Sequence, residues 1–96
     1  MSNEMGRETR AAFLEILEEM GTECQAGGEN RKAMITEDKQ ERTYVFCFSD
    51  EFAMKPGDKI KNWVTEADFT VIRTRALSAA GSFHYFEVTA KERAAT

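Results

Sequence analysis

The chain has 96 residues and a mass of 10.9 kDa, which fits a single domain with a core of modest size. Hydrophobic residues make up 42% and charged residues 31% of the chain, a balance that excludes an intrinsically disordered protein. The formal net charge is -4, the pI is about 5.0, and the longest basic run is the pair Arg31-Lys32. These values argue against a protein that binds DNA through phosphate contacts that release counterions.

Residues 4–20 are predicted to form the helix of the chain. Phe13, Ile16, Leu17 and Met20 recur at spacings of three and four, which gives one apolar face. Gly21 follows where a left-handed glycine cap is expected. Two interpretations of the apolar face stay open: it docks on the domain's own sheet, or part of it packs against a neighbouring subunit.

After the helix the pattern becomes that of strands. Segments 22–26 and 31–36 are predicted to form a hairpin around the turn 27–30. The charged run 37–42 is expected to be a solvated loop. Segment 43–49, Thr-Tyr-Val-Phe-Cys-Phe-Ser, is the strongest strand pattern, and we expect a central strand because neither face is polar.

The second half of the chain is organised around the turn Pro56-Gly57. Proline fixes φ at one corner and glycine accepts a positive φ at the next, which predicts a type II turn. The remaining pattern predicts a small-residue loop at 76–81, a disordered tail at 91–96 and three strands, which cover 59–63, 68–75 and 82–89.

About six short strands and one helix predict the fold class. We expect one α+β domain, residues 1–96, with an N-terminal helix (about 4–20) packed on a small, mainly antiparallel six-stranded β-barrel (about 22–90). Closing such a sheet into a barrel covers the strand edges that a small β-domain would otherwise expose.

No motif in the chain indicates catalysis, so we do not expect an enzyme. His84 is the lone histidine, and no Ser, Cys or Asp motif stands at a spacing that supplies a catalytic partner. Cys24 and Cys47 are interpreted as reduced apolar residues, and one histidine with two separated cysteines makes no familiar zinc set. No metal or cofactor is therefore expected. No apolar window is long enough to span a bilayer and the N-terminus shows no secretory pattern, so we expect a cytosolic protein.

An alternative function from another class is an OB-like or SH3-like barrel that binds single-stranded nucleic acid. Trp63 and Tyr44 would then serve as stacking platforms for bases. Because no basic residues interleave with these aromatic residues, we expect Trp63 to be packed in the core instead.

Three segments of the second half carry a resemblance to a known family. They are 54–60 (Met-Lys-Pro-Gly-Asp-Lys-Ile), 69–73 (Phe-Thr-Val-Ile-Arg) and 81–88 (Gly-Ser-Phe-His-Tyr-Phe-Glu-Val). In this region the chain resembles the small head–tail joining proteins of tailed bacteriophages, also called head-closure, stopper or head-completion proteins.

The resemblance implies a structural phage or prophage protein: a β-barrel subunit of a ring between the portal-adaptor complex and the tail. DNA would leave through that ring without sequence-specific contact, and no catalysis is implied. The protein would reside in the cytoplasm of the bacterial host during assembly and then in the virion. Family rings use loops that order on assembly, and the candidate interaction residues here are Glu37, Asp38, Lys39, Gln40, Arg75, Ala76, Leu77 and Ser78.

Overall fold

The structure is a computed structural model that describes residues 2–79 and 83–93, with side chains described for 10–77 and 85–93. Its elements, in chain order, are α1 (Ser2–Met20), β1 (Thr22–Ala26), β2 (Glu29–Asp38), β3 (Thr43–Phe48), β4 (Lys59–Asn62), β5 (Asp68–Ala79) and β6 (Phe83–Glu92).

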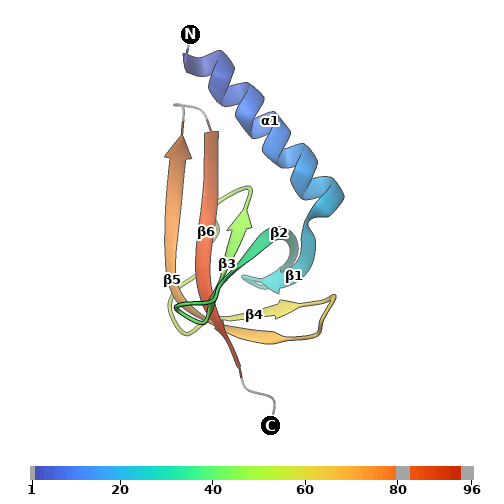
Figure 1. The fold of residues 1–96 in the computed structure, drawn as a ribbon, viewed down its shortest axis with the longest axis vertical. Coiled ribbons are helices and arrows are strands. Elements are labelled where there is room, and N and C mark those ends of the chain that lie inside the picture. Colours follow the sequence, from blue (N-terminus) through green and yellow to red (C-terminus); the bar gives the residue numbers. More distant parts are fainter. Residues whose placement is uncertain (1, 80–82, 94–96) are drawn as a thin grey trace.

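The six strands form a closed barrel in the order β1-β2-β3-β6-β5-β4, in which β4 returns to pair with β1. Every neighbouring pair is antiparallel. α1 lies outside the barrel and contacts β2 and β6 (Figure 1). The predicted α+β class, a helix packed on a small six-stranded antiparallel barrel, is confirmed.

The core is built from alternating residues of the strands. On β3, Phe46 and Phe48 are fully buried, as the period of two requires, while Tyr44 packs against the edge of the same cluster. Phe46 meets Phe69 of β5 edge-on at 5.0 Å between ring centroids. Edge-on and stacked aromatic pairs add to the burial energy and fill the narrow interior of a small barrel. The other buried side chains of this core cluster are Cys24, Ala26, Ala33, Ile60, Val71, Phe86, Val88 and Ala90.

Two tight turns set the register of the sheet. Gly27 and Gly28 both have positive φ (63° and 81°), so they make a two-residue hairpin turn, and β2 begins at Glu29, two residues earlier than expected. At Pro56-Gly57 the N–H of Asp58 donates to the carbonyl of Lys55 (3.1 Å), and Gly57 has φ +96°. Positive φ at that corner confirms the predicted type II turn.

The helix ends at Met20 as expected, but not with the expected left-handed cap. Gly21 donates its N–H to the carbonyl of Leu17 (2.8 Å), and its φ does not lie in the left-handed region. Glycine is needed there for space instead, because a Cβ on Gly21 would collide with the Leu17 carbonyl oxygen.

Two segments that were expected to be loops, 37–42 and 76–81, are partly strand, and residues 80 and 81 lie outside the described part. Glu37 and Asp38 belong to β2, and the turn is confined to 39–42, because the Asp38 carboxylate accepts the N–H groups of Gln40 and Glu41 (both 3.1 Å). The segment 76–79 belongs to β5, where pairing with Phe83–Phe86 of β6 outweighs the weak strand preference of its small residues. At the other end, β6 continues to Glu92, so the expected disordered tail is wrong for residues 91 and 92, and residues 94–96 lie outside the described part.

The β5–β6 pair extends past the rest of the barrel. β4 pairs with only the first three residues of β5, Asp68 to Thr70, and β3 reaches along β6 only to Phe86. A bulge between Val71 and Arg73 redirects β5 where it leaves β4. Figure 1 shows the two strands running along the long axis of the molecule beside α1, and the molecule measures 52 × 27 × 24 Å. We call residues 73–79 of β5 with 83–89 of β6 the β5–β6 ribbon. Its β5 strand lies beyond β4 along this whole range, whereas β3 still pairs with residues 86–89 of β6.

Candidate functional site

The titratable groups of the described chain do not converge. Among residues whose side chains are described, no three His, Cys, Asp or Glu side chains gather as a metal site would require. Burial raises the pKa of the Cys24 thiol to about 11, and burial followed by the charge of Glu87 raises the pKa of Cys47. Both thiols therefore stay protonated near neutral pH and are weak nucleophiles. The side chain of His84 lies outside the described part.

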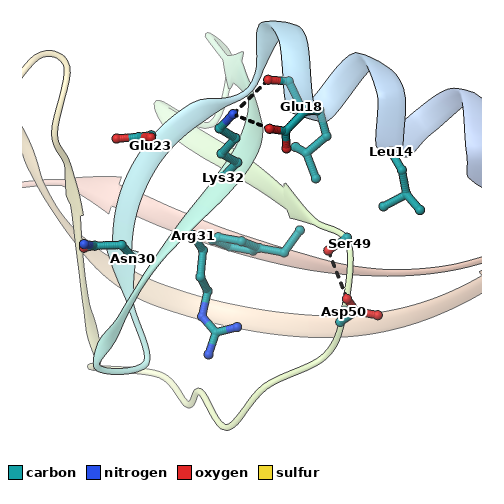
Figure 2. Close-up of a pocket in the computed structure, with 10 residues that line it drawn as sticks. Leu14, Glu18, Glu23, Asn30, Arg31, Lys32, Ser49 and Asp50 are labelled. Atoms are coloured by element: carbon teal, nitrogen blue, oxygen red, sulfur yellow. Dashed lines mark hydrogen bonds and ion pairs between the residues drawn. The ribbon is translucent and has the colours of Figure 1, made fainter.

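A groove of about 580 Å³ separates α1 from the barrel (Figure 2). It opens because the pairing of β2 with β3 stops at Met34 and Cys47, after which residues 30–32 and 48–50 diverge. Leu14, Leu17 and Glu18 line the helix side.

Ion pairs span this groove at both ends. The ammonium of Lys32 lies 2.8 Å from the Glu18 carbonyl and 3.4 Å from the Glu18 carboxylate. At the other end, the guanidinium of Arg10 donates to the Asp50 carboxylate at 3.0 Å and to the Ser49 carbonyl at 3.2 Å. The polar walls of the groove thus serve to hold α1 against the barrel.

Arg31 lines the groove from β2, and its side chain points away from α1 (Figure 2). Its guanidinium stacks 3.8 Å from the ring centroid of Phe52 and donates to the Ala26 carbonyl at 3.0 Å. The Glu29 carboxylate lies 3.3 Å from the Arg31 guanidinium and supplies an opposite charge. The cation is therefore committed to internal contacts, and it is a poor candidate for a ligand site.

The apolar face of α1 is divided between the barrel and solvent. Leu17 is buried (6% exposed), and Phe13 lies 6.4 Å from Tyr85 of β6 between ring centroids. Ile16 and Met20, which share the predicted stripe, are 46% and 71% exposed. Docking on the chain's own barrel thus uses only part of the stripe, which leaves large apolar side chains on the outer side of the helix.

Trp63 is exposed, so the prediction that it packs in the core is wrong. It follows β4 in the turn at residues 63–65, where the side-chain amide oxygen of Asn62 accepts the N–H groups of Val64 (2.9 Å) and Thr65 (3.2 Å). The indole N–H donates to Asn30 at 3.0 Å, and the Lys61 ammonium lies 5.4 Å from the ring centroid. The ring is 43% exposed, and Val64 beside it is 73% exposed.

The predicted interaction residues fall into two groups on different strands. Glu37 and Asp38 end β2, and Lys39 and Gln40 continue into the turn that follows. Arg75, Ala76, Leu77 and Ser78 lie on the β5 side of the ribbon. The two groups are not brought together in one barrel, because three strand positions separate β2 from β5 in the closed order.

Some exposed apolar residues were missed by sequence reasoning. Leu14 and Ile72 are each 38% exposed, and Val64 more so. The period of α1 places Leu14 off the main stripe, which could have indicated its exposure. Nothing local marks Ile72, whose exposure follows from the bulge in β5.

Comparisons with family models, with curated proteins and with solved structures find no match for this chain. Within the described residues, no helix is both long and apolar enough to cross a bilayer.

Proposed function

We propose that the chain is a structural subunit of a phage or prophage head–tail connector, assembling into a ring around the channel through which DNA leaves. The observation that carries the proposal is the β5–β6 ribbon, which projects from an otherwise closed barrel. A closed barrel hides its strand edges, so strands that continue beyond it present edges that another chain can use.

The divided apolar face of α1 supports association. Ile16 and Met20 remain largely exposed, although α1 already packs against the barrel through Leu17. Large exposed apolar side chains that cluster on one element are typical of protein–protein contacts.

The net charge also suits the proposed role. With a charge of -4 and no basic run beyond Arg31-Lys32, the subunit would not hold DNA by its phosphates. Arg31 is further neutralised by Glu29 and stacked on Phe52. DNA would slide past such a ring without sequence-specific contact. The partners are further copies of the chain, the portal-adaptor complex and the tail proteins, met in the host cytoplasm and then in the virion.

Electron microscopy of the purified chain over a range of concentrations tests the proposal. We expect discrete rings with a central opening, and sedimentation velocity should show a species many times the mass of the chain. Ile16→Lys should weaken the association, whereas Glu15→Lys, also exposed on α1, serves as the matched control. A chain that stays monomeric at every concentration would contradict the proposal.

One observation favours a second candidate, binding of single-stranded nucleic acid. The exposed ring of Trp63, held by Asn30 and accompanied by Lys61, resembles a stacking platform next to a cation. Tyr44 does not share this arrangement, because its ring packs edge-on against Phe69 at 5.1 Å between ring centroids. The negative charge of Glu37, followed by burial, raises the pKa of Tyr44, and that charge would repel a phosphate.

Titration with a labelled oligothymidylate at low salt tests this candidate. Binding that weakens steeply with salt and is lost in Trp63→Ala would support it. Absence of binding at low salt would remove it, and Val64→Ala is a control for general disruption of the turn.

A further inference from the structure

Within residues 2–79 and 83–93, the outer edge of β5 has no neighbouring strand beyond Val71. Val71 itself is engaged, since its N–H donates to the Asp58 carbonyl and its carbonyl accepts the N–H of Gly57 (both 2.8 Å). From residue 73 onward, the described part of the chain provides no backbone partner on that side.

The register identifies which backbone groups of β5 point outward. The backbone N–H and C=O of Val71 both form hydrogen bonds on the side away from β6, so the pair of Val71 with Ala90 is of the non-hydrogen-bonded type. The two types of pair alternate along antiparallel strands. Thr74 (opposite Val88) and Ala76 (opposite Phe86) are then also non-hydrogen-bonded pairs, and their N–H and C=O groups point away from β6.

A second unpaired edge lies on β2. β1 begins at Thr22 opposite Ala33, so among the described strands only β3 pairs with residues 34–38 of β2. The two-residue turn makes the Ala26–Glu29 pair hydrogen-bonded, and alternation then directs the backbone groups of Ile35 and Glu37 toward the missing neighbour. No backbone bond to these groups from the described residues fills that place.

The two edges face opposite sides of the barrel. In the closed order, three positions separate β2 from β5 in either direction around the barrel. The strands also run in opposite directions, because the path from β2 through β3 and β6 to β5 consists of three antiparallel pairings. A neighbouring copy in the same orientation therefore offers its β2 antiparallel to the β5 of the first.

The charges along the two edges are opposite. Arg73 and Arg75 are exposed on β5, and Arg75 has only a long ion pair to Glu87 (3.6 Å) at an exposed position. Glu37 and Asp38 are exposed on β2. Pairing of Ala76 with Glu37 would satisfy the outward backbone groups of both residues.

This register also places Arg75 directly opposite Asp38. That pair is non-hydrogen-bonded, the type in which opposed side chains come closest. The side chains of Arg75 and Asp38 both lie on the outer face of the sheet. Successive strand residues alternate between faces, and Ala76 and Glu37 are on the face that also carries the core residues.

We propose that the β5 edge of one copy pairs antiparallel with the β2 edge of a second copy, with Ala76 opposite Glu37 and Arg75 opposite Asp38. The proposal rests on the proposed ring and identifies the contact that would build it. Because different surfaces meet, the contact is head-to-tail, and it closes into a ring or continues as a filament according to the rotation at each step.

Two proline variants test the pairing by sedimentation velocity. Ala76→Pro removes an outward N–H of β5, and Glu37→Pro removes one of β2, without loss of a bond inside the barrel. Each variant alone should raise the dissociation constant about tenfold or more, since a hydrogen bond is lost and the proline ring blocks close approach. Ala76→Ser and Glu37→Gln are the matched controls and should assemble as the unaltered chain does.

Mixing the two variants distinguishes a head-to-tail contact from other contacts. Each variant keeps one intact edge, so an equimolar mixture should form a 1:1 dimer that cannot grow. Folding of each variant is checked by circular dichroism. If either is unfolded, the double variant Ala76→Cys with Glu37→Cys replaces it, and mild oxidation should give a ladder of covalent multimers that neither single variant gives.

The possible failures are separable. Full assembly of both folded proline variants, or oxidation without a ladder in a chain that assembles, overturns the strand pairing while the proposed ring stands. A chain that is monomeric at every concentration overturns both.

Discussion

Ile16 and Leu17 are adjacent on α1 but face different surroundings, and alanine substitution of each should separate folding from assembly. Leu17 is 6% exposed and lines the groove against the barrel, whereas Ile16 is 46% exposed. Leu→Ala at a buried site costs about 2 to 5 kcal/mol, and the open groove lets neighbours relax, so we expect the lower part of this range. For a domain of this size, such a loss lowers the Tm by about 10 to 20 °C.

Ile16→Ala should cost at most about 1 kcal/mol in the monomer, because little apolar surface is removed from the core. It should instead weaken self-association, as measured by sedimentation. Thermal and urea unfolding followed by circular dichroism in dilute solution measure the stability of both variants, and Glu15→Ala is the control for helix propensity. Equal destabilisation by Ile16→Ala and Leu17→Ala would refute the assignment of the two faces.

Three further predictions concern single groups. The Cys24 thiol has its pKa raised by burial to about 11 from an ordinary 9.0, so its contribution to stability is complete below pH 9 and is lost as the pH rises toward 11. Urea unfolding should show a loss of about 2 kcal/mol in the unfolding free energy over this pH range. Cys24→Val should reduce the fall of the unfolding free energy with pH, and an unchanged fall would contradict the prediction. Gly57→Ala should lower the unfolding free energy by about 1 kcal/mol through strain alone, since φ is +96° and a Cβ would meet open space; no loss would show that the turn is wrong. Trp63 fluorescence should be quenched readily by iodide in the folded chain, and a protected, blue-shifted emission would show that the ring is buried.

Local signals predicted much of this fold. The bounds of β1 and the Pro56-Gly57 turn depend on residues with narrow backbone preferences, and both are found where expected. The end of α1 at Met20 was also predicted, although Gly21 does not adopt the expected left-handed conformation. Segment 43–49 was likewise expected to be a central strand, and β3 has a neighbour on each side, but the pattern did not tell which of its two faces is the core side. Closure of the barrel was expected because few strands must cover their edges.

Tertiary context decided what the sequence could not show. The small residues of 76–79 form strand because β6 pairs with them, and no local preference indicates that. Trp63 is exposed because it lies in the turn after β4, which the Asn62 side chain closes by accepting the N–H groups of Val64 and Thr65. In the same way, the periodicity of α1 gives an apolar stripe but does not tell which part of it the barrel covers.

The two groups of candidate interaction residues were expected in loops, but all of them except Lys39 and Gln40 lie on strands. Their position at unpaired edges could not be foreseen, because an edge depends on where the neighbouring strand stops. The charges of Glu37, Asp38 and Arg75 were visible in the sequence, but their relation across the barrel required the strand order.

Amide hydrogen exchange in dilute and in assembled protein tests the central claim most directly. The amides of Ala76 and Glu37 should exchange rapidly in the dilute chain and become protected on assembly, whereas the amide of Arg75, already bonded to β6, should be protected in both states. Rapid exchange at Ala76 and Glu37 in the assembled protein would contradict the account.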